Sequence, residues 1–219
     1  MNRRFAGAVL ASALTSALLA SSWGVASAAA GVTFDEDTCF GEDPTVELES
    51  DQPYTDTSGV DDVIIGGGSV NAGDGDDLIC DAAYVLGGAG DDRIRMLDGG
   101  TARGNTGDDE FVSITVNTEV AGPVLDGGPG NDIFWGGTQG ETIYAGAGVD
   151  VVWAGGGDDE VWLGSGNDKG YGQPGNDTFY GMSGDDFVDG GLGTDTVEGG
   201  SGRDTCRAVE VKTSCKRVR

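Results

Sequence analysis

The chain has 219 residues, of which 42 are glycine, and its acidic residues outnumber its basic residues by 38 to 12. This charge makes nucleic acid a poor partner. The absence of histidine excludes Ser-His-Asp and Cys-His catalysis, His-ligated zinc and HExxH metalloprotease chemistry. A chain this acidic is either disordered or needs cations in order to fold, and the spacing of its acids decides between the two.

Residues 1–30 have the pattern of a secretory signal peptide. Arg3 and Arg4 precede an apolar run over residues 5–20, and residues 26–28 supply the small side chains of a cleavage site. The run is short for a stable membrane span, although an uncleaved membrane anchor is the alternative interpretation. The residues after Arg4 fit the pattern of twin-arginine export poorly. We therefore expect a secreted, extracellular protein with no membrane span.

Residues 31–66 alternate acidic and apolar side chains between turn formers, and we expect them to form the N-terminal cap of a stacked fold. The four cysteines of the chain are an even set in an exported protein, which makes disulfides the default. Three pairings are possible, and sequence proximity favours Cys39–Cys80 and Cys206–Cys215. A zinc site of four thiolates is the alternative, which the absence of a CxxC pair disfavours.

Residues 67–126 contain irregular copies of a nine-residue unit. The copies are AGDGDDLIC from Ala72, GGAGDDRIR from Gly87 and GNTGDDEFV from Gly104, and insertions separate them. Residues 113–120 (SITVNTEV) alternate well enough to predict a longer strand of the same fold.

Residues 127–207 divide into nine consecutive units of nine residues without a gap. Position four is glycine in every unit but one, where Gln139 replaces it. Glycines permit φ > 0, so the first half of each unit is predicted to be a turn. The second half is predicted to be a three-residue strand with position eight pointing inward. Position six is always acidic: Asp132, Glu141, Asp150, Asp159, Asp168, Asp177, Asp186, Asp195 and Asp204.

Two units complete one coil of 18 residues, and stacked coils form two parallel sheets that face each other. The predicted fold is therefore all-β, a right-handed parallel β-roll (a β-helix solenoid). We expect the gap left by Gly170 to be filled by Phe179, and the core is too slender to offset the entropy of ordering so many glycines. The predicted core residues are Phe134, Val152, Gly170, Val188 and Cys206 in one sheet, and Ile143, Val161, Phe179 and Val197 in the other.

Calcium would supply the missing stability. Aspartates 18 residues apart lie about 4.8 Å apart along the stacking axis, and they would repel one another without a cation. A hard dication accepts about 6–8 oxygens from carboxylates and backbone carbonyls, so each site would be shared between coils and binding would be coupled to folding. Magnesium fits less well, because it keeps its waters. The candidate ligands are Asp132, Asp150, Asp159, Asp168, Asp177, Asp186, Asp195 and Asp204, with Asp77, Asp92 and Asp109 from the irregular copies.

The units resemble the GGxGxDxUx repeat of the RTX, or hemolysin-type calcium-binding, family, closely over residues 127–207 and loosely over residues 72–112. The layout is similar to that of small exported actinobacterial proteins of this type, which implies a calcium-loaded β-roll with the position-six aspartates as ligands. Glu141 and Gln139 depart from the pattern, which puts in doubt a calcium site between Glu141 and Asp159, the acids at position six of two successive coils. No lipase, protease or pore-forming segment precedes the repeats, so we expect a repeat module without an effector domain.

Position nine predicts two columns of aromatic side chains on the outer faces of the sheets. One interpretation is structural, as stacking between neighbouring strands. The alternative is a cell-envelope or matrix adhesion module that binds a cell-surface polysaccharide or a second copy of the chain. The columns are Trp135, Trp153 and Tyr171, and Tyr144, Trp162 and Tyr180.

Residues 208–219 form a basic C-terminal tail, which we expect to cap the acidic fold electrostatically; contact with an anionic envelope is the alternative. Enzyme activity has little support, since the chain has no GxSxG elbow and no P-loop. We therefore interpret the chain as a calcium-binding protein and not as an enzyme.

Overall fold

The computed structural model describes residues 39–42, 44–48, 53–56, 59–115, 117 and 119–217. These residues belong to a compact unit that spans Thr33–Arg219. The expected signal peptide, residues 1–30, lies outside the described residues. No described segment forms a helix that is able to cross a membrane.

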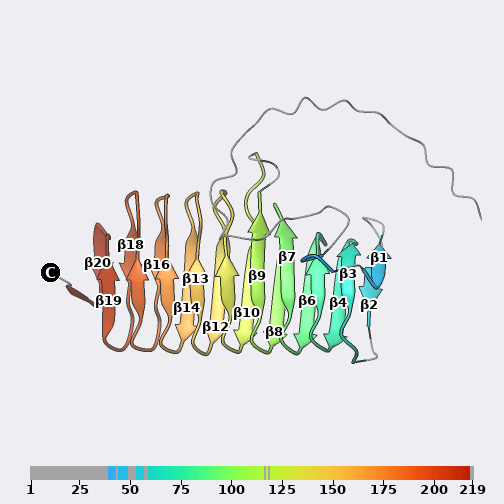
Figure 1. Ribbon diagram of the computed structural model, residues 1–219. Helices are drawn as coiled ribbons and strands as arrows, with labels where there is room; N and C mark the ends of the chain where they lie inside the picture. The colour runs from blue at the N-terminus through green and yellow to red at the C-terminus, as the bar shows by residue number, and fades with distance from the viewer. Residues whose placement is uncertain are drawn as a thin grey trace, which may run out of the picture. The chain divides into compact units, whose positions relative to one another are not determined.

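The described chain winds into a parallel β-solenoid of about nine turns, and its coils follow one another in chain order (Figure 1). Successive strands alternate between two sheets, and every strand pair is parallel, which confirms the predicted all-β architecture. The 11-stranded sheet, called sheet 1 below, contains β1 (Val46–Leu48), β3 (Val63–Gly66), β5 (Leu78–Cys80), β7 (Arg93–Leu97), β9 (Glu110–Ile114), β11 (Ile133–Trp135), β13 (Val151–Trp153), β15 (Lys169–Tyr171), β17 (Phe187–Asp189), β19 (Asp204–Arg207) and β21 (Cys215–Arg217). The 10-stranded sheet, called sheet 2, contains β2 (Pro53–Thr55), β4 (Ser69–Asp74), β6 (Tyr84–Ala89), β8 (Thr101–Thr106), β10 (Val124–Pro129), β12 (Thr142–Ala147), β14 (Glu160–Ser165), β16 (Thr178–Tyr180), β18 (Thr196–Glu198) and β20 (Val211–Thr213).

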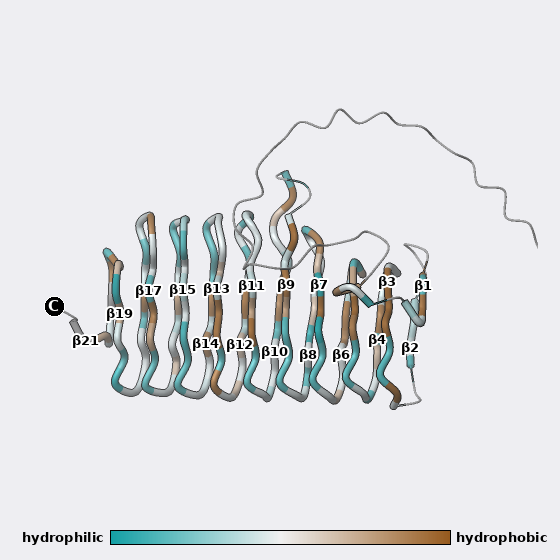
Figure 2. Tube along the Cα trace, in the orientation of Figure 1, coloured by the Kyte–Doolittle hydropathy of each residue, from teal (hydrophilic) through white to brown (hydrophobic). Residues whose placement is uncertain are grey.

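The core lies between the two sheets and includes the position-eight side chains that were predicted to point inward, together with buried side chains at position one and from the irregular coils. Figure 2 shows the hydrophobic segments recurring along the strands from coil to coil. Phe179 fills the gap left by Gly170, because a β-carbon added to Gly170 would lie 2.6 Å from Cε1 of Phe179. The strand registers join Phe134, Val152, Gly170, Val188 and Cys206 in sheet 1, and Ile143, Val161, Phe179 and Val197 in sheet 2.

The coils before the regular block differ in length. The longest of them lies between Asp109 and Asp132 and is called the wide coil below. The separation between stacked residues is 15 from Asp77 to Asp92, 17 from Asp92 to Asp109, 23 from Asp109 to Asp132, and 18 in the next coil. The extra residues follow β9, which continues into a loop beyond the neighbouring turns (Figure 1). The prediction of a strand over residues 113–120 is wrong: β9 ends at Ile114, because the chain leaves the sheet there to form this loop.

Disulfides lie near both ends of the described solenoid. Cys39 pairs with Cys80 and Cys206 with Cys215, which confirms the pairing favoured by sequence proximity. The first disulfide holds residues 39–42 against sheet 1, where the Phe40 ring lies 4.2 Å from the guanidinium carbon of Arg93. At the other end, β20 and β21 continue the two sheets beyond Arg207.

Candidate functional site

The position-six acids form two buried rows, one on each edge of the solenoid, where the glycine turns meet the strands. Each row ends in a less buried acid: Asp62 is half-buried, and Glu210 is exposed. The first-edge row runs from Asp62 through the irregular coils to Asp204, and the second-edge row starts only at Glu141. All the aspartates that the sequence singled out as ligands are at most 2% exposed. The first-edge row contains Asp62, Asp77, Asp92, Asp109, Asp132, Asp150, Asp168, Asp186 and Asp204; the second-edge row contains Glu141, Asp159, Asp177, Asp195 and Glu210.

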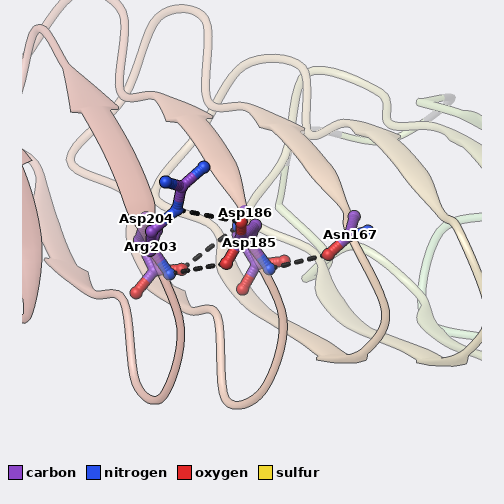
Figure 3. Close-up of polar contacts among 5 residues, drawn as sticks. All are labelled: Asn167, Asp185, Asp186, Arg203 and Asp204. Atoms are coloured by element: carbon purple, nitrogen blue, oxygen red, sulfur yellow. Dashed lines mark hydrogen bonds and ion pairs between the residues drawn. The ribbon is translucent and has the colours of Figure 1, made fainter.

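Within each row, the backbone N–H of one acid donates a hydrogen bond to the carboxylate of the acid in the following coil. The backbone N–H of Asp168 donates to Oδ1 of Asp186 at 3.0 Å. The N–H of Asp186 donates in the same way to Oδ1 of Asp204 at 3.1 Å (Figure 3). The same bond joins Asp109 to Asp132 at 2.8 Å across the wide coil. The rows therefore remain continuous where the sequence spacing is irregular.

The second oxygen of each buried carboxylate has no hydrogen-bond partner. This holds for Oδ2 of every aspartate that the sequence predicted as a ligand, and for Oε2 of Glu141. A buried polar atom without a partner costs about 1–3 kcal/mol, and more when it carries charge. The four ion pairs that the described residues show use Asp81, Glu110, Asp126 and Asp185, none of which belongs to the buried rows. The rows therefore require an external positive charge or protons.

Backbone carbonyls from the next coil face the same space as these oxygens. A β-carbon added to Gly181 would lie 2.7 Å from Oδ2 of Asp186 and 2.4 Å from the carbonyl oxygen of Gly199. The space beside Gly172 has the same arrangement, with Asp177 and the Gly190 carbonyl. Among the described residues, no three acidic or cysteine side chains already surround one point, so a cation there would need such carbonyls. Gly172 and Gly181 occupy position one of their units. In three other units, position one carries a buried side chain instead, that of Ala145, Ala154 or Leu163.

Burial also shifts the protonation of the rows. Removal from water raises the pKa of Asp150, Asp168 and Asp186 to about 6, although the backbone hydrogen bond that each accepts opposes the shift. Burial raises the pKa of Asp92 and Asp132 to about 8, with neighbouring carboxylates adding to the effect. The charged form of these groups is thus disfavoured until a cation neutralises it.

Exposed side chains at position five form a further row along each edge, and the sequence reasoning missed them. Here each side chain accepts a hydrogen bond from the coil that follows: the N–H of Asp185 donates to Oδ1 of Asn167, and the N–H of Arg203 donates to Oδ1 of Asp185, both at 2.8 Å (Figure 3). Short Asn and Asp side chains recur at this position, which was the available signal. The exposed rows hold the turns together from outside.

Sequence reasoning also missed Asp62 and Glu210, which extend the rows. The N–H of Asp62 donates to Asp77 at 2.7 Å, and the N–H of Asp195 donates to Oε2 of Glu210 at 2.8 Å. Both pairs are 15 residues apart, so neither fits the nine-residue count. The hydroxyl of Tyr54 donates to Oδ2 of Asp62 at 2.8 Å, which satisfies that oxygen.

Residues 124–140, 135–169 and 171–206 match the family model of the RTX calcium-binding nonapeptide repeat, in four copies. No match was found among curated proteins or among solved structures. The matched residues contain the regular coils and most of both buried rows. The family match and the geometry therefore identify the same nine-residue unit as the repeat of the solenoid. The chain therefore carries RTX calcium-binding nonapeptide repeats, folded as a parallel β-solenoid.

Proposed function

We propose that the chain is a secreted calcium-binding protein that holds several calcium ions between successive coils along its two edges. The observation that supports this most strongly is the row of buried carboxylates, each with one oxygen that lacks a partner. Carboxylate and carbonyl oxygens are the ligands that calcium prefers. The proposed ligands are Asp77, Asp92, Asp109, Asp132, Asp150, Asp168, Asp186 and Asp204 on the first edge, and Asp159, Asp177 and Asp195 on the second.

We further propose that calcium drives folding. A bound ion supplies the positive charge that the rows lack, and it joins two coils, so binding and coil stacking favour each other. Without it, the unpartnered oxygens oppose the burial of a thin core in a chain with 42 glycines. The predicted export and the two disulfides support folding in an extracellular environment rich in calcium.

The geometry of the aromatic columns supports a structural role. The rings of Trp135 and Trp153 stack with centroids 4.0 Å apart and 3° between their planes, and those of Tyr144 and Trp162 stack at 4.6 Å and 14°. These rings cover each other's faces, whereas a sugar that stacks on an aromatic side chain needs a free face. We therefore assign the columns to coil–coil stabilisation, and we propose binding and not catalysis as the activity of the chain.

Equilibrium dialysis of the chain from residue 31 onward, with calcium and separately with magnesium, tests the proposal. We expect several calcium ions per chain with dissociation constants of about 10⁻⁴–10⁻³ M, and much weaker magnesium binding. Absence of calcium binding at 10⁻² M would contradict the proposed function.

A further inference from the structure

The head of the second-edge row lies under the wide coil. Strand β9 extends beyond its neighbour β11, so that Ser113 in the strand and Thr115 just after it contact the segment that leads to Glu141. The N–H of Thr138 donates to Oγ1 of Thr115 at 2.9 Å, and the hydroxyl of Ser113 donates to Oε1 of Glu141 at 3.0 Å. No acid of the row precedes Glu141, because Pro123 occupies the equivalent position in the coil before it.

Glu141 is 2% exposed, and its two oxygens have different surroundings. Oε1 accepts hydrogen bonds from Ser113 and from the N–H of Gly137, the latter at 3.1 Å, whereas Oε2 has no hydrogen-bond partner. The next acid of the row, Asp159, accepts the N–H of Glu141 at 2.7 Å through Oδ1, and its Oδ2 also lacks a partner. Two buried carboxylates from successive coils therefore each present one unpartnered oxygen.

Both carboxylates are at most 2% exposed, so water does not compensate their charge. None of the ion pairs among the described residues reaches either carboxylate. The carbonyl oxygen of Gly140 lies on the side of Oε1, the oxygen that Ser113 and Gly137 already bind, since a β-carbon added to Gly122 would lie 2.9 Å from each of these two oxygens.

We propose that Glu141 and Asp159 hold a calcium ion at the head of the second edge, with Ser113 as the residue that positions Glu141. The site differs from the repeat sites, because one ligand is a glutamate and because the wide coil, rather than a preceding repeat, closes it. The extra methylene of glutamate is what allows the side chain to reach Ser113 on β9. The inference relies on the proposed function for the identity of the ion.

The test compares the number of calcium ions bound per chain in three variants with the number bound by the original chain. Glu141→Gln keeps the size of the side chain and an oxygen for Ser113, but removes the charge. Glu160→Gln is the matched control, because it makes the same charge change at an exposed position of β14. Ser113→Ala keeps both carboxylates and removes only the positioning hydroxyl. Circular dichroism in calcium checks that each variant is folded.

We expect Glu141→Gln to bind one ion fewer and Glu160→Gln to bind the original number. Ser113→Ala should keep the original number while one ion requires about tenfold more calcium, as is typical when a partner of a metal ligand is removed. An unchanged count in folded Glu141→Gln overturns the inference, and it leaves the proposed function intact if other ions remain bound. Absence of calcium in the original chain means instead that the proposed function fails. A count that falls equally in both Gln variants indicates a general charge effect and also overturns the inference.

Discussion

The substitution Asp186→Asn removes one charge from the middle of the first-edge row and leaves its shape unchanged. The side chain is 2% exposed, and Asn retains an oxygen that accepts the N–H of Asp168. Asp186 lies between Asp168 and Asp204 in the row, so it is shared by two proposed calcium sites. The variant should therefore lose both ions without losing the backbone hydrogen bonds of the row.

The size of the loss follows from the proposed affinity. With dissociation constants of about 10⁻⁴–10⁻³ M and about 10⁻² M free calcium, each site contributes about 1.4–2.7 kcal/mol to the free energy of unfolding. Loss of two sites should lower this free energy by about 3–5 kcal/mol.

Asp185→Asn is the matched control for this substitution. Asp185 is the exposed neighbour: its Oδ1 accepts the N–H of Arg203 at 2.8 Å, and its Oδ2 lies 3.3 Å from Nε of Arg203. Asn occupies the same position in other coils, at Asn131, Asn167 and Asn176. The control should therefore change the free energy of unfolding by no more than about 1 kcal/mol, which is typical of an exposed ion pair.

Urea unfolding followed by tryptophan fluorescence, at about 10⁻² M calcium, measures both variants under the same conditions. The reasoning predicts that Asp186→Asn is much less stable than Asp185→Asn under these conditions. Equal stabilities of the two variants in calcium would refute the assignment of the buried row as the calcium site.

Three further predictions concern protons, the core and the disulfides. After removal of calcium by a chelating resin, β-structure measured by circular dichroism should increase as the pH falls from 7.5 to 4.5. Burial raises the pKa of Asp150, Asp168 and Asp186 from 3.8 to about 6, so the folded chain binds more protons and loses stability as the pH rises through 6. No change over this range would contradict the predicted burial. Gly170→Val should destabilise the calcium-bound chain by about 1–3 kcal/mol, because the valine side chain would collide with Phe179. Adding Phe179→Val to this variant should restore most of the lost stability, measured by thermal unfolding. Independent, additive effects of the two substitutions would speak against this contact. Removal of Cys39–Cys80, which are 41 residues apart, should cost about 4 kcal/mol in urea unfolding, against about 2.5 kcal/mol for Cys206–Cys215, which are 9 residues apart; the reverse order would count against this loop-length argument.

The regular part of the fold was predictable because one local rule repeats there without interruption. From Gly127 onward, a period of nine residues fixes which side chains point inward and which acids stack, so the core from Phe134 to Cys206 follows from counting. The first-edge aspartates of the irregular coils were found from three looser copies of the nine-residue unit, each of which contains the sequence Gly-Asp-Asp. Their connection into one row was not predictable, because the insertion between Asp109 and Asp132 is absorbed by a loop whose path depends on tertiary contacts.

Residues 113–120 show where local alternation fails. Thr115 and Asn117 alternate with apolar residues as they would in a strand, but they hydrogen-bond to other turns: Thr115 accepts the N–H of Thr138, and the N–H of Asn117 donates to Oδ2 of Asp98 at 2.5 Å. These partners are distant in sequence and offer the backbone an alternative to a sheet. The contact between Ser113 and Glu141 was missed for the same reason, since the two residues are 28 positions apart.

Far-UV circular dichroism of the chain from residue 31 onward, titrated with calcium and then with EDTA, tests the central claim most directly. The account predicts a transition from coil to β-structure that calcium induces, EDTA reverses and magnesium reproduces only weakly. A β-spectrum that is complete without calcium and unaffected by EDTA would contradict it, because the core and the two disulfides would then be sufficient for folding.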